Sequence, residues 1–171
     1  MAVLKLIKKP YRDDDVINNL VGYALNQDKM INMCYGGSGV SIENPIESMY
    51  AMKKALNLPS GKQAEHFILA FNQKELSKLT IPLIKQIAYD ICEYFQGIQV
   101  VFALHEINND YYSTDEFDSD KPHIHFVLNT VNAYTGGKFY INYNNEFDIR
   151  NYIEYLLFFY NISDKVTLSV K

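Results

Sequence analysis

The chain has 171 residues, of which 48% are apolar and 21% are charged, the balance typical of one globular domain with an apolar core. That composition excludes wholesale disorder, and no run of about 18 apolar residues is present to cross a membrane. Sixteen basic against twenty acidic residues give a net charge of −4, which argues against a protein that holds nucleic acid by bulk electrostatics alone. We therefore expect residues 1–171 to form a single domain with no membrane insertion.

Two features indicate a cytoplasmic protein. Residues 1–12 place their apolar stretch before their lysines, which is the reverse of a secretory signal. The two cysteines, Cys34 and Cys92, are too few for a disulfide framework, so a reducing compartment is expected.

The first part of the chain predicts a strand and two helices. Residues 2–7 alternate loosely between apolar and polar side chains, a pattern that predicts a short strand. Three aspartates open a helix over residues 13–25, whose apolar side chains recur at helical spacing. The glycine-rich stretch 26–41 predicts a loop that can include a short strand over 31–34. Residues 44–56 predict a second helix, because a proline stands at its first helical position.

The middle of the chain predicts three buried strands and one helix. Residues 65–71 and 98–105 are apolar runs of strand length, and residues 82–95 between them place their apolar side chains on one helical face. Residues 122–130 predict a third long strand. The segment 106–121 is too polar and acidic to form a crossover helix, so the two strands that it joins should be antiparallel neighbours.

The last part of the chain completes the predicted fold. A turn leads into a short strand over residues 138–141, an unusually aromatic helix covers 145–161, and a strand covers 165–170. The fold class is therefore α+β (mixed α/β), with one central, largely antiparallel sheet of about five strands and helices packed on it.

Three of the four histidines bracket the predicted hairpin. His123 and His125 are two residues apart, so on a strand both imidazoles lie on one face, roughly 6.5–7 Å apart along the backbone. His105 ends the partner strand, where it can supply a third ligand. Three imidazoles that leave coordination positions open are what a catalytic metal needs.

Other interpretations of these residues stay open. A strand histidine is more often a hydrogen-bonded core residue than a ligand, and His66, whose neighbours look buried, is expected in the core or directly behind the ligands. A structural zinc site would need a fourth ligand, and the two cysteines lack the paired spacing of such sites. Asn129 is four residues from His125 and therefore on the same face, where it can contact a ligand or a phosphate.

Several motifs resemble those of one enzyme family. Residues 122–132, PHIHFVLNTVN, resemble the histidine signature of the conjugative relaxases, the mobilisation nucleases of the HUH endonuclease superfamily that nick plasmid and transposon transfer origins. The strand ending in His105 resembles the one that carries their first metal histidine, and residues 23–29 resemble their Y-x-x-N-x-x-K motif. EHFILAF resembles their middle strand motif, and residues 136–139 resemble the Gly-Lys segment after their histidines. The resemblance covers about residues 15–160 in the family's order.

The resemblance implies an enzyme that nicks and rejoins one DNA strand at a specific site. Tyr23 would be the nucleophile, forming a 5′-phosphotyrosine link that the free 3′-hydroxyl can later reverse. His105, His123 and His125 would hold a divalent metal ion, Mn²⁺ or Mg²⁺, at the scissile phosphate. The substrate would be single-stranded or hairpin DNA at the transfer origin of a plasmid or integrative element. Accessory transfer proteins and a coupling protein would be its partners.

The resemblance also implies supporting roles for nearby residues. Lys29, the last residue of the tyrosine motif, would neutralise phosphate. The family often has an acid two residues after its first histidine, but that position is Ile107 here, so Glu106 is a candidate to support the ligands together with His66. A frequent serine of the family's middle strand is Ala70 in this chain.

Two other functions remain open at this point. The first is another HUH nuclease, a rolling-circle replication initiator or a transposase. In a single-tyrosine transposase the nucleophile follows the histidines, which would select Tyr152, Tyr155 or Tyr160 on the last predicted helix. The second is a catalytically degenerate domain that only binds DNA or metal. If Tyr23 is not the nucleophile of a relaxase, Tyr11 and Tyr35 are the reserves.

Overall fold

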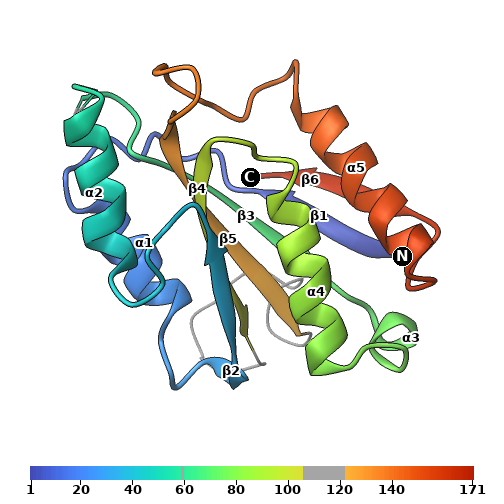
Figure 1. The fold of residues 1–171 in the computed structure, drawn as a ribbon. Helices are drawn as coiled ribbons and strands as arrows, with labels where there is room; N and C mark the ends of the chain where they lie inside the picture. The colour runs from blue at the N-terminus through green and yellow to red at the C-terminus, as the bar shows by residue number, and fades with distance from the viewer. Residues whose placement is uncertain (59, 106–121) are drawn as a thin grey trace.

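The computed structural model describes residues 1–58, 60–105 and 122–171, whose strands form one six-stranded sheet (Figure 1). The strands lie in the order β2-β4-β5-β3-β1-β6, and each neighbouring pair is antiparallel except β1 and β6, which are parallel. The prediction of a largely antiparallel sheet is therefore confirmed, with one strand more than expected. The strands are β1 (Ala2–Leu6), β2 (Met30–Ser38), β3 (Ala64–Ala70), β4 (Ile98–His105), β5 (His123–Asn132) and β6 (Val166–Val170).

Helices cover both faces of the sheet (Figure 1). On one face, α1 and α2 pack on β4 and β5 over a small core that includes Val101 and Val127. On the other face, α4 and α5 cover a larger core that includes Phe102 and Phe126. Successive strand residues alternate between these two cores, as the pleat requires. The helices are α1 (Val16–Ala24), α2 (Pro45–Ala55), α3 (Gln73–Leu76), α4 (Ile81–Cys92) and α5 (Glu146–Phe159).

The largest departure from the sequence prediction is β2. The stretch 26–41, expected as a loop with at most a short strand, contains a nine-residue edge strand that pairs with β4. Gly36 lies within this strand and not in a turn: a Cβ built on it would be 2.6 Å from Phe102 Cζ and 2.6 Å from Tyr89 Oη. The glycine therefore allows the edge strand to approach two aromatic side chains closely. From the sequence alone, a glycine with this role cannot be distinguished from a glycine in a turn.

Three smaller differences concern short elements. The predicted strand over 138–141 is reduced to an isolated bridge between Val131 and Lys138. The short helix α3 was not expected, although Asn72 caps it and forms a reciprocal capping box with Glu75, a pattern visible in the sequence. The predicted acidic loop over 106–121 lies outside the described residues.

Both cysteines are free and buried. Burial raises the pKa of the Cys92 thiol to about 12, so this residue packs in the core and does not act as a nucleophile. In the described ranges, no helix has the length and apolar character that would let it cross a bilayer.

Candidate functional site

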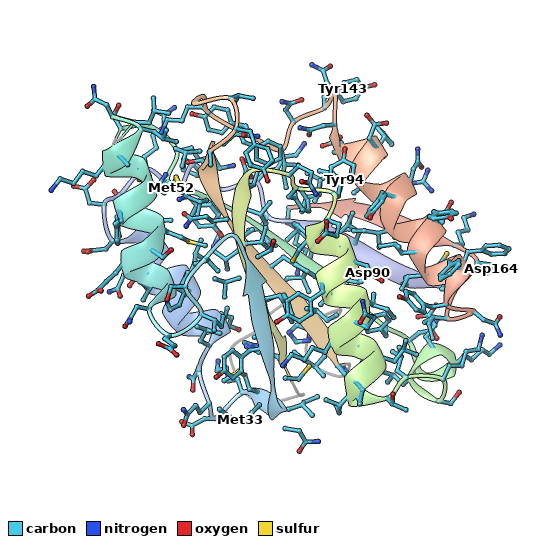
Figure 2. All side chains as sticks on the ribbon, viewed as in Figure 1. Met33, Met52, Asp90, Tyr94, Tyr143 and Asp164 are labelled. Atoms are coloured by element: carbon cyan, nitrogen blue, oxygen red, sulfur yellow. The ribbon has the colours of Figure 1, made fainter. Side chains whose placement is uncertain are left out.

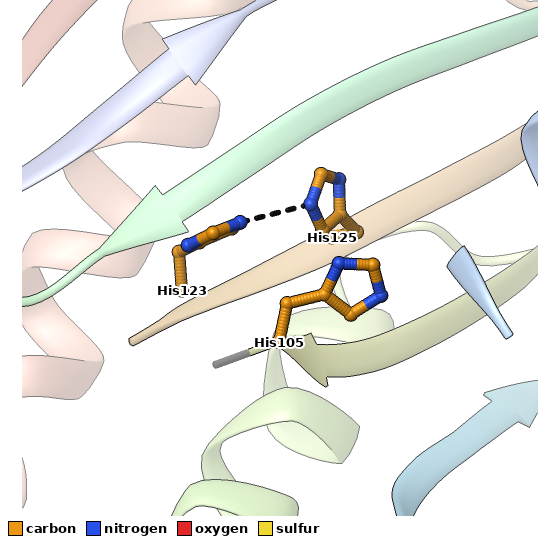
Figure 3. A group of neighbouring side chains, drawn as sticks. All are labelled: His105, His123 and His125. Atoms are coloured by element: carbon orange, nitrogen blue, oxygen red, sulfur yellow. Dashed lines mark hydrogen bonds between the residues drawn. The ribbon is translucent and has the colours of Figure 1, made fainter. Parts of the chain in front are cut away.

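The three histidines of the predicted hairpin meet at one end of β4 and β5 (Figure 3). His105 ends β4 and pairs directly with His123, the first residue of β5. His125 follows on the same strand face, with its Nε2 3.0 Å from Nε2 of His123. One ligand nitrogen from each residue lies within 4.8 Å of the other two. The structure therefore brings together the three imidazoles that the sequence singled out.

Hydrogen bonds decide which nitrogen each ring presents. The Nε2–H of His105 donates to the carbonyl oxygen of Ala24 at 2.7 Å, which leaves Nδ1 with the free lone pair. Nδ1 of His125 is 2.9 Å from Nε2 of His66, so Nε2 of His125 is the nitrogen that faces His123. Such bonds hold the ring orientation and the tautomer of metal-binding histidines.

His66 lies directly behind His125, on the neighbouring strand β3. The two rings stack with their centroids 5.2 Å apart and 18° between their planes. The remaining ring nitrogen of His66, Nδ1, is 3.5 Å from the hydroxyl of Tyr11. His66 is buried and contacts the site through His125, which fits the expectation that it lies in the core or behind the ligands.

Burial keeps His66, His105 and His125 neutral near neutral pH. Desolvation lowers the pKa of His66 to about 4, and it is also the main cause that lowers the pKa of His105 and places that of His125 well below its ordinary value. The charge of Lys29 adds to this effect at His105 and His125. A neutral imidazole is the form that binds a metal ion, and a cation at the rim suits an approaching phosphate.

The donor set fits a divalent metal ion. Two nitrogens 3.0 Å apart can both reach one ion at the usual nitrogen–metal distance of about 2.0–2.1 Å. His105 and His125 are buried while His123 is half-buried, so the cluster keeps a side from which a substrate oxygen can approach. Imidazole nitrogen also favours first-row transition metals over Mg²⁺.

Tyr23 stands beside this cluster on the last turn of α1. Its ring centroid is 5.5 Å from that of His105 and 5.3 Å from that of His125, and 44% of the residue is exposed. Nζ of Lys29 lies 4.6 Å from the centre of the Tyr23 ring. Since the carbonyl of Ala24 accepts the His105 hydrogen bond, the end of α1 is attached to the same histidine that Tyr23 contacts. The tyrosine motif and the histidine motif therefore lie side by side in the fold.

The tyrosines of α5 lie far from this cluster, because α5 packs over the core on the opposite face of the sheet. The hydroxyls of Tyr152 and Tyr160 both donate to Asp90, which is labelled on α4 in Figure 2. Tyr155 is exposed on the outer surface of α5 and stacks on Phe159. None of the three α5 tyrosines is placed near the histidines.

The reserve tyrosines have other positions. The hydroxyl of Tyr11 is directed toward His66, behind the ligands, and burial raises its pKa, which disfavours the phenolate. Tyr35 lies on the edge strand β2, paired with Ala103. Among the candidates, Tyr23 is the one whose ring contacts two of the three clustered histidines.

Asn129, a further candidate from the sequence, lies away from the cluster. Asn129 is fully buried under α2, where its Nδ2 donates to the carbonyl of Met49 and to Oε1 of Gln99. It therefore joins the helix to the sheet and does not face the histidines. Glu106 lies outside the described residues.

One contributor to the site was not found from the sequence, and a second, Tyr11, was considered there only as a reserve nucleophile. The carbonyl of Ala24 is a backbone group, and its only signal was its place next to Tyr23. Tyr11 lies on the irregular segment after β1, and nothing in its sequence neighbourhood indicates contact with a histidine 55 residues later.

The chain matches a known protein family over most of its length. The profile of a family described as relaxase, MobA/VirD2-like, nuclease domain, matches residues 23–161, which is more than half of the chain. The matched span begins at Tyr23 and includes all four histidines. Comparison with curated proteins returned no match.

Proposed function

The chain belongs to the MobA/VirD2-like relaxases, metal-dependent nucleases that nick DNA for mobilisation, and on this premise we propose that it nicks and rejoins one strand at a transfer origin by tyrosine transesterification. The substrate in this proposal is single-stranded or hairpin DNA at the origin of a plasmid or integrative element. Accessory transfer proteins and a coupling protein are its proposed partners, and the cytoplasm is its proposed location.

The observation that carries the proposal is the position of Tyr23. Its ring contacts His105 and His125, and one ligand nitrogen from each of these and from His123 lies within 4.8 Å of the other two. A phenol next to an open metal-ligand set is the arrangement that attack on a phosphodiester needs, because nucleophile and Lewis acid must reach the same phosphorus.

In the proposed reaction the Tyr23 oxygen attacks the scissile phosphorus. The phenol loses its proton, the bond from phosphorus to the 3′ oxygen breaks, and that oxygen leaves as a 3′-hydroxyl. The product is a 5′-phosphotyrosine, and attack by a 3′-hydroxyl on the same phosphorus reverses the sequence and releases Tyr23.

The protein's own residues position the reacting groups. His105, His123 and His125 would hold the divalent ion, which when bound supplies a Lewis acid that stabilises negative charge on the phosphate. Lys29 lies against the Tyr23 ring, where its ammonium can attract the same phosphate. The proposed ion is Mn²⁺ or Mg²⁺: imidazole ligands favour manganese, zinc, cobalt or nickel over Mg²⁺ by affinity, whereas cellular abundance favours Mg²⁺.

His66 has a positioning role in this proposal. For Nε2 of His125 to offer its lone pair, its Nδ1 must carry the proton, and that proton is donated to Nε2 of His66. His66 then carries its own proton on Nδ1, on the side of the Tyr11 hydroxyl. A hydrogen bond in this direction between the two imidazoles therefore supports the tautomer of His125 that can bind metal.

The test is covalent capture of DNA. The protein is incubated with labelled single-stranded origin DNA and Mn²⁺, with and without EDTA, and the products are separated on a denaturing protein gel. We expect a metal-dependent protein–DNA band that Tyr23→Phe abolishes and Tyr35→Phe, a matched phenol deletion on a neighbouring strand, retains. A band that persists in Tyr23→Phe would assign the nucleophile elsewhere, and bound metal without any adduct would favour a degenerate DNA-binding domain.

A further inference from the structure

Exposed aromatic side chains run along the outer surface of α5. The inner surface of this helix packs on the sheet through Ile149, Ile153 and Leu157, which are buried. A helix that covers a sheet in this way normally carries charged and polar side chains on its outer surface. Here every fourth residue from 143 to 159 is exposed, and these five, which we call the outer row, are Tyr143, Phe147, Asn151, Tyr155 and Phe159.

The aromatic residues of the outer row form two contacting pairs. Tyr143, labelled beside the start of α5 in Figure 2, packs edge-on against Phe147 with the ring centroids 5.9 Å apart. Tyr155 stacks on Phe159 with the centroids 6.5 Å apart. Residues four apart are neighbours on a helix surface, so Asn151 lies between the two pairs. The outer row is therefore continuous along the helix.

The outer row and its surroundings are large enough to form a protein interface. The aromatic residues of the row are exposed by between 46% and 76%, and the neighbouring Phe158 is exposed by 68%. Since a phenylalanine or tyrosine side chain offers about 200 Å², these residues leave roughly 600 Å² of aromatic surface in each copy, the upper end of what a monomer exposes in one patch. Two copies that cover each other would remove roughly 1,200 Å² from water, the size at which specific interfaces begin.

The charges on α5 leave the outer row free for an apolar contact. Asp148 is the one exposed charged residue of this helix, and it lies beside the row. Arg150 and Glu154 are half-buried and pair with each other, with Nη1 and Oε2 3.0 Å apart. Protein interfaces show this distribution, with few charges at the centre and polar groups at the rim.

The outer row is symmetric about Asn151, since a tyrosine–phenylalanine pair follows at equal spacing on each side. Two copies of α5 that pack antiparallel about a twofold axis at Asn151 would place Tyr143 of one copy opposite Phe159 of the other, and Phe147 opposite Tyr155. Every aromatic residue of the row would then face an aromatic residue. The two Asn151 amides, which each offer donors and an acceptor, would meet at the axis and fix the register.

We propose that the outer row of α5 is a homodimer interface with its twofold axis at Asn151. Rows of residues four apart are inclined to the helix axis, so the two rows become parallel when the helices cross at about −50°, the commonest packing angle. A partner of different sequence would need no symmetry in this row, whereas a second copy requires it. Because α5 covers the face of the sheet opposite the histidines, both clusters stay accessible, and association does not require the nicking activity.

Sedimentation velocity tests this interface. An interface of this size supports a Kd in the micromolar range or below, so we expect the unsubstituted protein to be mainly dimer at about 100 μM. Tyr155→Glu places a charge against Phe147 of the second copy and should weaken dimerisation at least tenfold. The matched control is Tyr134→Glu, at an exposed tyrosine on the turn after β5, which should dimerise like the unsubstituted protein.

Circular dichroism confirms that both variants are folded. An unsubstituted protein that is monomeric at this concentration would overturn the proposal and would leave the outer row to a partner of another kind. A dimer that Tyr155→Glu leaves intact, or that Tyr134→Glu weakens equally, would place the interface elsewhere on the molecule.

Cross-linking gives a second readout that keeps all the aromatic residues. In a twofold dimer a residue meets its own copy only close to the axis, so Asn151→Cys should form an intermolecular disulfide on mild oxidation. The matched control is Asn19→Cys, at an exposed position of α1 on the other face of the sheet, and the two native cysteines are buried. We expect a dimer band on a non-reducing gel for Asn151→Cys alone. Equal bands for the two variants, or no band for either, would contradict an axis at position 151.

Discussion

At the scale of single residues, the site depends on hydrogen bonds that decide which ring nitrogen is free. His105 donates to the Ala24 carbonyl, and His125 contacts His66 through Nδ1, so both rings are held before any ion arrives. His123 is the half-buried member of the three. The orientation of the metal-binding rings therefore depends on groups that do not touch the substrate, and His66 is the clearest example.

Replacing His66 should therefore weaken metal binding while leaving the three ligands in place. We expect His66→Leu, which cannot accept from His125 Nδ1, to reduce Mn²⁺ affinity about 10–100-fold. His66→Gln, whose carbonyl oxygen can accept the same proton, should retain more of the affinity. The measurement is titration of Mn²⁺ followed by the electron paramagnetic resonance signal of the free ion. A His66→Leu variant that is folded and binds Mn²⁺ as tightly as the unsubstituted protein would contradict the positioning role.

The burial of Lys53 predicts a pH dependence of the stability of the protein. Lys53 is 2% exposed, and its Nζ donates to Oγ1 of Thr130 at 2.9 Å. Burial, and secondarily the charge of Lys138, lowers the pKa of Lys53 to about 8. Between this value and the ordinary 10.5, the unfolded chain binds more protons than the folded one, so this lysine makes stability rise with pH across that window.

We therefore expect Lys53→Met to be at least as stable as the unsubstituted protein at pH 7, where the buried charge is fully present. Its advantage should shrink from pH 8 toward pH 10, by at most about 1.4 kcal/mol per pH unit. Lys54→Met, an exposed neighbour on α2, should show no such pH dependence. Urea unfolding at pH 7 and at pH 10 measures the difference in stability between each variant and the unsubstituted protein. A stability gain of Lys53→Met that is the same at both pH values would contradict burial of the charge as the cause.

At the scale of elements, α1 and β2 show how the same residue type serves different purposes. Gly22 lies inside α1, and a Cβ added to it would meet no atom within 4 Å. Gly36 lies inside β2, where an added Cβ would be 2.6 Å from side-chain atoms of Phe102 and Tyr89. The first glycine only lowers helix stability, whereas the second is required for the edge strand to reach β4.

These two glycines give opposite expectations for the same substitution. Gly22→Ala should stabilise the protein by about 0.5–1 kcal/mol, because alanine loses less backbone entropy in a helix. Gly36→Ala should destabilise it by about 1–3 kcal/mol, because two aromatic side chains must move. Both values come from urea unfolding curves, and a neutral Gly36→Ala would show that β2 can shift away from Tyr89 without loss.

At the scale of the whole molecule, metal binding should couple to folding. The three ligands come from two strands that meet only in the folded sheet, so an ion that binds them stabilises the native state. At a free Mn²⁺ concentration of 100 times Kd the gain is about 2.7 kcal/mol, which corresponds to a rise in Tm of roughly 5–11 °C. Thermal melts with and without Mn²⁺ measure this rise. His123→Ala should abolish it and Asn151→Ala should not, and an equal rise in His123→Ala would place the ion elsewhere.

Much of this molecule follows from local sequence patterns. The spacing of His123 and His125 places both on one strand face, and the polar segment after His105 makes its strand the antiparallel neighbour, so the three-histidine cluster could be predicted. The two patterns are sufficient because strand alternation and hairpin pairing are local properties. The motif beginning at Tyr23 likewise indicated a tyrosine near this cluster, and the structure places it in ring contact.

Other features depend on which distant segments become neighbours. The contact of His66 with His125 joins residues 59 apart and exists because β3 lies next to β5. The sequence predicts a loop in place of β2 because the reason for a glycine at position 36 is its close contact with Tyr89 and Phe102. These side chains approach it only in the folded chain. Asn129 was placed on the correct face, but only the packing of α2 over β5 decided that it is buried and bonded to Gln99. Strand order and helix packing are set by the whole core, and so no local pattern encodes them.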